Sequence, residues 1–162
     1  MRGAGKADTR TGQPEVSRHV GRSLSGSLME ARIMAFENIV ATLPGAVAGA
    51  DLRLYQHHFV KQSTTANEVT LCGDGELPVG VLLNKPNSGE PASVAILGAG
   101  NVCKVVCGAA VTAGDKVSSG ASGVANTAAS SDYTAGIAID TVASVTAAEV
   151  VSVLLVPVAA LA

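Results

Sequence analysis

Short runs of alternating apolar and polar residues recur between residues 58 and 139. This two-residue period is typical of β-strands with one face in a core, because successive side chains point to opposite faces of a sheet. Val79, Val81 and Leu83, for example, are expected to share one buried face. The strands predicted in this way are 58–61, 68–72, 79–83, 93–97, 102–107, 116–118, 123–126, 137–139 and 150–156.

Turn-forming residues separate these runs and support the strand assignment. Glycine adopts positive φ and aspartate bonds nearby backbone, so Gly73–Gly75 and Ala113–Asp115 predict tight turns, and Gly98–Asn101 predicts a hairpin turn. The run 150–156 is apolar on both faces, which indicates a central strand ended by Pro157. The pattern predicts an all-β fold, a small β-sandwich or barrel of about eight to nine short strands with a flexible N-terminal arm.

Three parts of the chain differ in pattern. Residues 1–33 have no sustained period and are expected to be a flexible extension, or an artefact if translation begins at Met34. Residues 34–54 are apolar but broken by proline and glycine, and predict an extended arm leading into the fold. Residues 55–162 form the predicted β-rich domain, in which only 142–149 offers a turn or two of helix.

Composition and charge narrow the functional classes. Six basic and three acidic residues give the segment 1–33 a charge of +3, whereas five basic and ten acidic residues give the remainder −5. With two Tyr, two Phe and no Trp, the acidic body is not expected to bind nucleic acid directly. No apolar run reaches the roughly 20 residues of a membrane helix, and no secretory signal is recognisable, so synthesis in a reducing cytoplasm is expected.

Candidate reactive groups have simpler structural explanations. Cys72, Cys103 and Cys107 are predicted to be free thiols; on one strand the last two would lie about 13 Å apart, beyond disulfide reach. Adjacent His57 and His58 would point to opposite faces of a strand and could not easily share a metal ion. We therefore expect no catalytic, cofactor-binding or metal site.

An ordered series of motifs resembles the capsid cement, or head decoration, proteins of tailed phages. The series covers roughly residues 50–157 and consists of 59–61, 69–73, 77–86, 89–94, 108–117, 123–124, 136–138 and 150–157. The resemblance implies a structural virion protein, not an enzyme, that binds the outer surface of an assembled capsid and stabilises the shell. The partners it implies are the major capsid protein and further copies of the chain, as a trimer.

The arm and one loop provide the candidate contact residues. The segment 36–52 either lies on a neighbouring molecule or packs on its own domain, and the sequence leaves both open. The residues expected to contact the capsid or another copy are Phe36, Ile39, Val40, Leu43, Pro44, Leu52, Tyr55, Asn84, Lys85 and Pro86.

Two other functional classes remain open at this stage. One is a lipoyl- or biotinyl-like carrier, with Lys85 as the modified residue, or another β-barrel binding module. The other is an enzyme with a nucleotide site at Gly98–Gly100. The nucleotide site is disfavoured because Cys103 occupies the third glycine position and β-branched residues follow.

Overall fold

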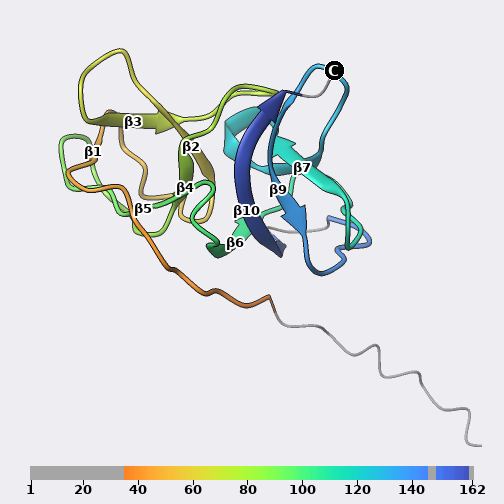
Figure 1. Ribbon diagram of the computed structural model, residues 1–162. Coiled ribbons are helices and arrows are strands. Elements are labelled where there is room, and N and C mark those ends of the chain that lie inside the picture. Colours follow the sequence, from red (N-terminus) through yellow and green to blue (C-terminus); the bar gives the residue numbers. More distant parts are fainter. Residues whose placement is uncertain (1–34, 146–148, 161–162) are drawn as a thin grey trace, which may run out of the picture. The chain divides into compact units, whose positions relative to one another are not determined.

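The computed structural model describes residues 35–145 and 149–160, which form ten strands and one short 3₁₀ turn (Figure 1). The extension predicted for residues 1–33 lies outside this range. The elements are β1 (Val47–Ala48), β2 (Phe59–Gln62), β3 (Glu68–Leu71), β4 (Gly80–Leu82), β5 (Val94–Ile96), β6 (Val102–Val106), β7 (Lys116–Ser119), η1 (Ala121–Gly123), β8 (Ala125–Thr127), β9 (Tyr133–Ala138) and β10 (Val150–Ala160).

The strands form two five-stranded sheets, which confirms the all-β fold. The N-terminal sheet has the order β1-β3-β2-β4-β5 and the C-terminal sheet the order β6-β10-β9-β7-β8. All neighbours are antiparallel except β1 and β3. The hairpin predicted at Gly98–Asn101 is wrong, because β5 and β6 belong to different sheets and the turn carries the chain from one to the other. A local turn signal shows where the chain reverses but not which strands then pair.

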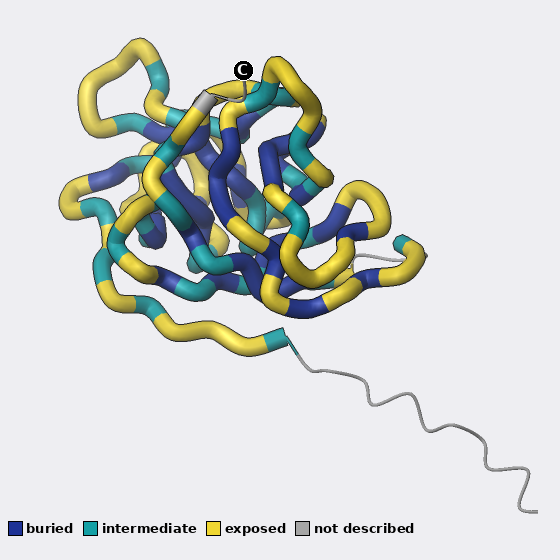
Figure 2. Tube along the Cα trace, turned by 45° about the vertical axis from the view of Figure 1, so that its right-hand side comes forward, coloured by how far each residue is buried: buried dark blue, intermediate teal, exposed yellow. Residues whose placement is uncertain are grey.

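The C-terminal sheet curls until its two edge strands touch. Cys107, directly after β6, forms a parallel bridge with Ala125 of β8, and the Gly108 N–H donates to the Ala125 carbonyl oxygen at 2.9 Å. The inward side chains of this sheet form the larger core cluster, together with Phe59, Val81 and Ala95 from the N-terminal sheet. Figure 2 shows this buried interior surrounded by exposed loops.

The N-terminal sheet is buried on both faces. Phe59 and Val81 face the C-terminal sheet, whereas Val60 and Leu82 pack with Leu52 in a second core cluster. The shared face predicted for Val79, Val81 and Leu83 is therefore confirmed for Val81 and Leu83 and wrong for Val79. The strand is apolar at consecutive positions, and Val79 packs on the second cluster while Leu83 packs on the first.

Strand β10 continues beyond the end predicted for it. It lies between β6 and β9, as expected for a central strand, but it runs on to Ala160. The register with β9 shifts between Leu155 and Ala159, so Pro157 lies in a bulge where its missing N–H removes no ladder bond. The predicted helix at 142–149 is absent from its described residues, of which Val142 instead bridges to Val111.

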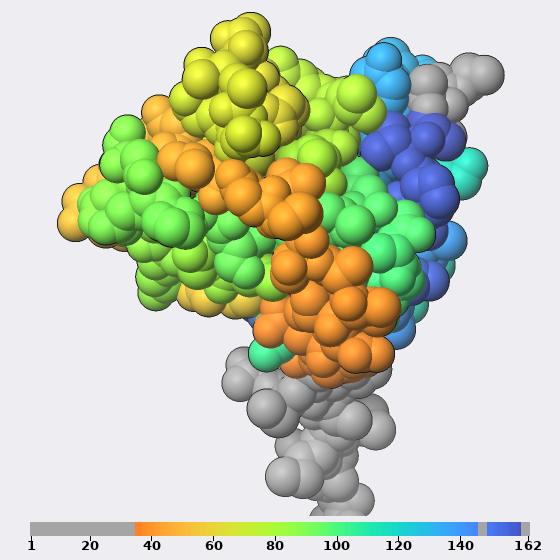
Figure 3. Space-filling model, turned by 60° about the vertical axis from the view of Figure 1, so that its left-hand side comes forward, coloured from red at the N-terminus to blue at the C-terminus, as the bar shows by residue number. Residues whose placement is uncertain are grey.

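The beginning of the described chain, residues 35–46, here called the arm, packs on its own fold. Asn38 pairs with Val102 of β6, and Thr42 pairs with Ala95 of β5. The arm therefore covers the outer edges of both sheets, as an additional strand would. Figure 3 shows the arm in orange, lying across the surface against the green residues of β5 and β6.

The buried side chain of Asn101 makes four hydrogen bonds where the arm meets the body. Its Oδ1 accepts the N–H groups of Val40 at 2.6 Å and Ala41 at 3.0 Å, and its Nδ2 donates to the carbonyl oxygens of Ala41 and Ile96, each at 2.8 Å. Asn101 is 0% exposed. Because the side chain satisfies four backbone groups where the chain passes between the sheets, it replaces ladder bonds that no strand supplies there.

Asn101→Ala is expected to lower the free energy of unfolding by about 3 kcal/mol, because it leaves several buried backbone groups without partners. Asn38→Ala is the matched control, since Asn38 is an exposed arm residue that bonds through its backbone; it should cost less than about 0.5 kcal/mol. Urea unfolding measures both variants. Equal losses would show that Asn101 has no special role in holding the arm.

Candidate functional site

Polar and charged side chains from four separate segments gather on one face of the protein around His57. We call this set, Glu37, His57, His58, Lys85 and Lys104, the His57 cluster. Glu37 comes from the arm and Lys104 from the outward face of β6, while the histidines lie in the turn before β2 and Lys85 lies in the loop between β4 and β5.

The arm side of the cluster is fixed by strand pairing. The Phe36 N–H donates to Ser152 Oγ at 2.8 Å, and Asn38 exchanges two backbone hydrogen bonds with Val102, at 2.8 and 2.9 Å. Ser152 is in turn the register partner of Lys104 across β10 and β6. Glu37 therefore lies over β6, the strand that carries Lys104. Phe36, the residue before Glu37 in the arm, is 47% exposed.

His57 connects the two sheets at the centre of the cluster. Its N–H donates to the Leu82 carbonyl oxygen at 2.7 Å, and its carbonyl oxygen accepts the Val106 N–H at 2.9 Å. His57 has φ of 65°, in the left-handed region, and lies in a turn, while His58 precedes β2, which begins one residue later than the predicted strand 58–61. The buried Nδ1 of His57 lies 3.5 Å from Glu37 Oε1, an ionic approach without a hydrogen bond.

The ionisation of His57 depends on its burial and on its charged neighbours. Burial lowers the pKa of His57 from its ordinary value of 6.5, and Glu37 opposes this shift. The positive charges of Lys104, His58 and Lys85 lower the pKa further. Each of these groups therefore lies within electrostatic range of the His57 ring.

The loop that carries Lys85 is held at both ends. Asn84 Oδ1 accepts the Ser93 N–H, and Asn84 Nδ2 donates to the Pro91 carbonyl oxygen, both at 2.9 Å. The Pro86 carbonyl oxygen accepts the Leu52 N–H at 3.0 Å. These bonds fix the backbone on each side of Lys85, whose side chain is exposed.

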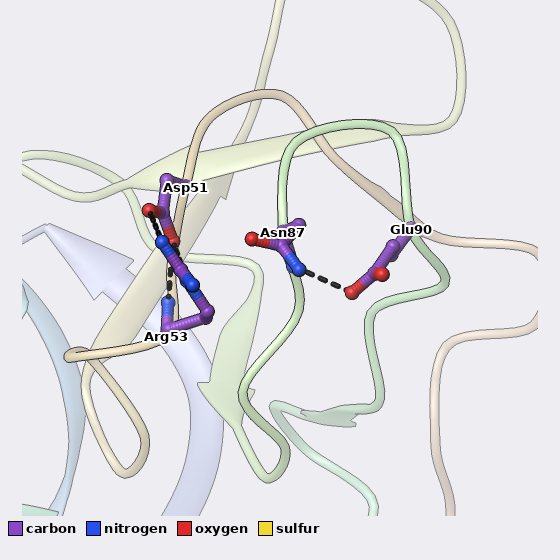
Figure 4. A network of polar contacts seen from close by, with 4 residues as sticks. All are labelled: Asp51, Arg53, Asn87 and Glu90. Carbon is purple, nitrogen blue, oxygen red and sulfur yellow. Dashed lines mark hydrogen bonds and ion pairs between the residues drawn. The ribbon is translucent and has the colours of Figure 1, made fainter.

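The neighbouring loops carry ion pairs and turn contacts of their own (Figure 4). Arg53 Nη2 lies 2.7 Å from Asp51 Oδ2, and this hydrogen-bonded guanidinium lowers the pKa of Asp51 to about 2. In the β4–β5 loop the Asn87 N–H donates to Glu90 Oε2 at 2.7 Å. Arg53 and Glu90 therefore already have partners, unlike the two lysines of the cluster, for which the described residues show no ion pair.

The predicted contact residues divide by exposure. Phe36, Val40, Pro44 and Lys85 are exposed, with Val40 at 65%, whereas Ile39, Leu43, Tyr55 and Asn84 are half-buried. Leu52 and Pro86 are buried and support the surface from below. Glu37 and Lys104 are not among the predicted contact residues. The available signal was that Lys104 is the one charged residue within the strand 102–106.

A second feature is an apolar groove of about 590 Å³ near the far end of β10. Its floor includes Gly98 and Pro157, which are close enough that a Cβ on Gly98 would contact the proline ring. Leu77 is 52% exposed at this groove. The complete lining is Gln62, Leu77, Pro78, Val79, Leu97, Gly98, Pro157 and Val158, with no charged side chain.

The three cysteines are buried free thiols, as predicted. Burial raises the pKa of Cys103 to about 12 and that of Cys107 to about 11, and it also raises the pKa of Cys72. Because the thiolate is the nucleophilic form, none of these groups is poised for covalent chemistry near neutral pH. They act as small core side chains, with Cys103 and Cys107 on the same inward face as Val105.

The described residues give little support to the other kinds of site considered. They contain no group of three His, Cys, Asp or Glu side chains placed to hold a metal ion. Gly98–Gly100 leads into β6 and not into the helix that a dinucleotide-binding turn requires. In the same part of the chain, no helix has the length and apolar character needed to cross a membrane.

Comparison with known proteins supplies a family and a fold. The family model described as phage cement protein matches residues 56–155. The crystal structure of the head fiber gp8.5 N base in bacteriophage phi29 is similar, with a TM-score of 0.54 and 17% sequence identity over 68% of this chain and 89% of that one. At such low identity this similarity shows a shared fold only. No curated protein matches the chain.

His57→Asn is expected to flatten the dependence of stability on pH. Because the pKa of His57 is lowered in the folded state, its contribution to stability is present above 6.5 and is lost as the pH falls below that value. Asparagine tolerates the same positive φ. Unfolding free energies at about pH 7.5 and about pH 5.5 should therefore differ more for the natural chain than for the variant. If the unfolding free energy fell by the same amount between the two pH values in both proteins, this role for His57 would be ruled out.

The thiols are expected to be protected in the folded protein. A disulfide reagent at about pH 8 should react slowly with the native protein and rapidly with all three cysteines after unfolding, because the buried thiols remain protonated. Absorbance of the released thiolate measures the reaction. Rapid labelling of even one native cysteine would contradict the burial described above.

Proposed function

The chain belongs to the phage cement protein family, and from this premise we propose that it binds the outer surface of an assembled phage capsid and stabilises the shell. The family makes the chain a phage structural protein with its place in the virion capsid. The observation that carries the proposal is the family match over residues 56–155. In this proposal the chain is not an enzyme, and the protonated, buried thiols are consistent with that role.

The proposed stabilisation follows from mass action. A protein that binds only the assembled lattice lowers the free energy of the intact shell relative to its separated subunits. A rigid binder loses little conformational entropy on docking. The strand pairing of the arm and the Asn101 hydrogen bonds support this proposal, because they order the arm before any partner is present.

The proposed contact surface is the exposed side of the arm with the adjoining loops. Phe36 and Val40 would provide apolar contacts, and Lys85 a charged one. Ile39, Leu43, Pro44, Tyr55 and Asn84 would border them, while buried Leu52 and Pro86 would hold the loops in position. The proposed partner is the major capsid protein.

We further propose that the chain acts as a homo-oligomer, a trimer by family resemblance, made in the host cytoplasm. Several copies linked in one closed assembly would contact several capsid subunits at once. The second and third contacts would then be intramolecular, which raises the overall affinity without new kinds of contact.

The direct test mixes purified protein with phage heads that lack it. Saturable binding and greater resistance of the heads to heat are expected for the natural chain. Phe36→Ser combined with Val40→Ser should weaken binding by about tenfold or more, because two exposed apolar contacts are lost.

Leu77→Ser is the matched control for that test, because Leu77 is similarly exposed but lines the apolar groove and is not part of the arm. It should leave the affinity for heads within about twofold. Failure of the folded natural chain to bind heads would overturn the proposed function. Equal weakening by Leu77→Ser and by the arm variant would overturn the assignment of the contact surface to the arm.

A further inference from the structure

We propose that the His57 cluster is the electrostatic part of the contact surface and that it receives a carboxylate-bearing patch of the capsid protein. The inference rests on the proposed function and names the partner chemistry of that same surface. The inference follows from the positions of the few lysine and arginine side chains in the acidic residues 34–162.

The body of the protein has few cations, and most have defined positions. Residues 34–162 contain five basic residues against ten acidic ones. Arg53 is paired with Asp51, and Lys61 Nζ lies 2.7 Å from Glu76 Oε2. The His57 N–H bonds the Leu82 carbonyl oxygen, three residues before Lys85, and the His57 carbonyl oxygen bonds the Val106 N–H, two residues after Lys104, whereas Lys116 lies on β7. Two of the three cations without a carboxylate partner in the described residues therefore lie on the two segments that the His57 backbone joins.

The cluster is built from rigid parts. Lys104 lies within β6, and Asn84 and Pro86 fix the backbone on either side of Lys85. The Gln56 side chain donates to the Leu83 carbonyl oxygen at 2.7 Å, which ties the histidine turn to the same loop. Because the backbone that carries the two lysines is ordered before binding, little backbone entropy is lost when a partner docks there.

Glu37 shows that a carboxylate fits beside the His57 ring. Its Oε1 approaches the buried Nδ1 to 3.5 Å without forming a hydrogen bond, so Nδ1 has no hydrogen-bond partner within the described residues. Buried polar atoms in proteins usually have one. One internal carboxylate against two lysines leaves the cluster with an excess of positive charge, which a carboxylate from a partner would complement.

The same features favour a protein partner over a nucleic acid. Tyr55 already packs against His58, with ring centroids 5.4 Å apart and the rings perpendicular, and this leaves Phe36 as the exposed ring beside the cluster. Two lysines on a body of charge −5 are too few to release the counterions that drive binding to a phosphate backbone. A short run of aspartate or glutamate side chains on the capsid exterior matches the cluster in sign and extent.

The test compares charge-reversal variants on phage heads at low salt. Lys85→Glu combined with Lys104→Glu should weaken binding by about tenfold, and the loss should shrink as salt is added. Lys116→Glu, which changes the net charge by the same amount per residue outside the cluster, should stay within about twofold. Lys85→Gln with Lys104→Gln is the milder pair if the double reversal disturbs folding.

Glu37→Gln is expected to change the affinity for phage heads in the opposite direction. Removing the one acid of the cluster should tighten binding to heads severalfold, because the field of the cluster becomes more positive. Saturable binding of the natural chain with no difference between the cluster variants and Lys116→Glu would overturn the inference while the proposed function stands. Binding of duplex DNA that is lost in the cluster variants would also overturn it, whereas no binding of heads by any form would overturn the proposed function itself.

Discussion

An open sheet edge presents unpaired backbone groups, and the structure depends on how two such edges are covered. The arm covers β5 and β6, but where it passes from one sheet to the other the Val40 and Ala41 N–H groups bond to a side chain and not to a strand. That side chain is Asn101, which makes four hydrogen bonds there. The same hydrogen bonds hold the arm on the surface of the protein. The apolar residues Phe36 and Val40 are exposed on this arm.

The alternation of side chains predicted most of the strands because burial on one face leaves a two-residue period. It described Cys103, Val105 and Cys107 correctly, since β6 has one inward face. It was right about Val81 and Leu83 but wrong about Val79, because β4 is covered on both sides and Val79 packs on the other cluster. The same pattern predicted that β10 ends at Pro157. The strand continues because Pro157 lies in a bulge, where its missing N–H removes no ladder bond, and the sequence does not show that bulge.

The candidate surface was harder to predict than the fold. Phe36, Val40 and Lys85 could be selected from a resemblance and from their place in apolar or loop segments. Glu37 and Lys104 could not, because they are brought together by pairing between residues more than sixty positions apart. Adjacent His57 and His58 gave a misleading signal, since a left-handed turn and not a strand sets their directions. Groups that meet through long-range pairing leave no local pattern in the sequence.

These features give one account, in which a rigid β body displays an apolar arm beside a small basic cluster and binds a shell through both. Electron cryomicroscopy of decorated phage heads tests it most directly. The account predicts that the arm, the Lys85 loop and β6 face the capsid, with acidic capsid side chains near Lys85 and Lys104. A reconstruction with the groove at Leu77 and Pro157 against the shell, and the arm turned to solvent, would contradict it.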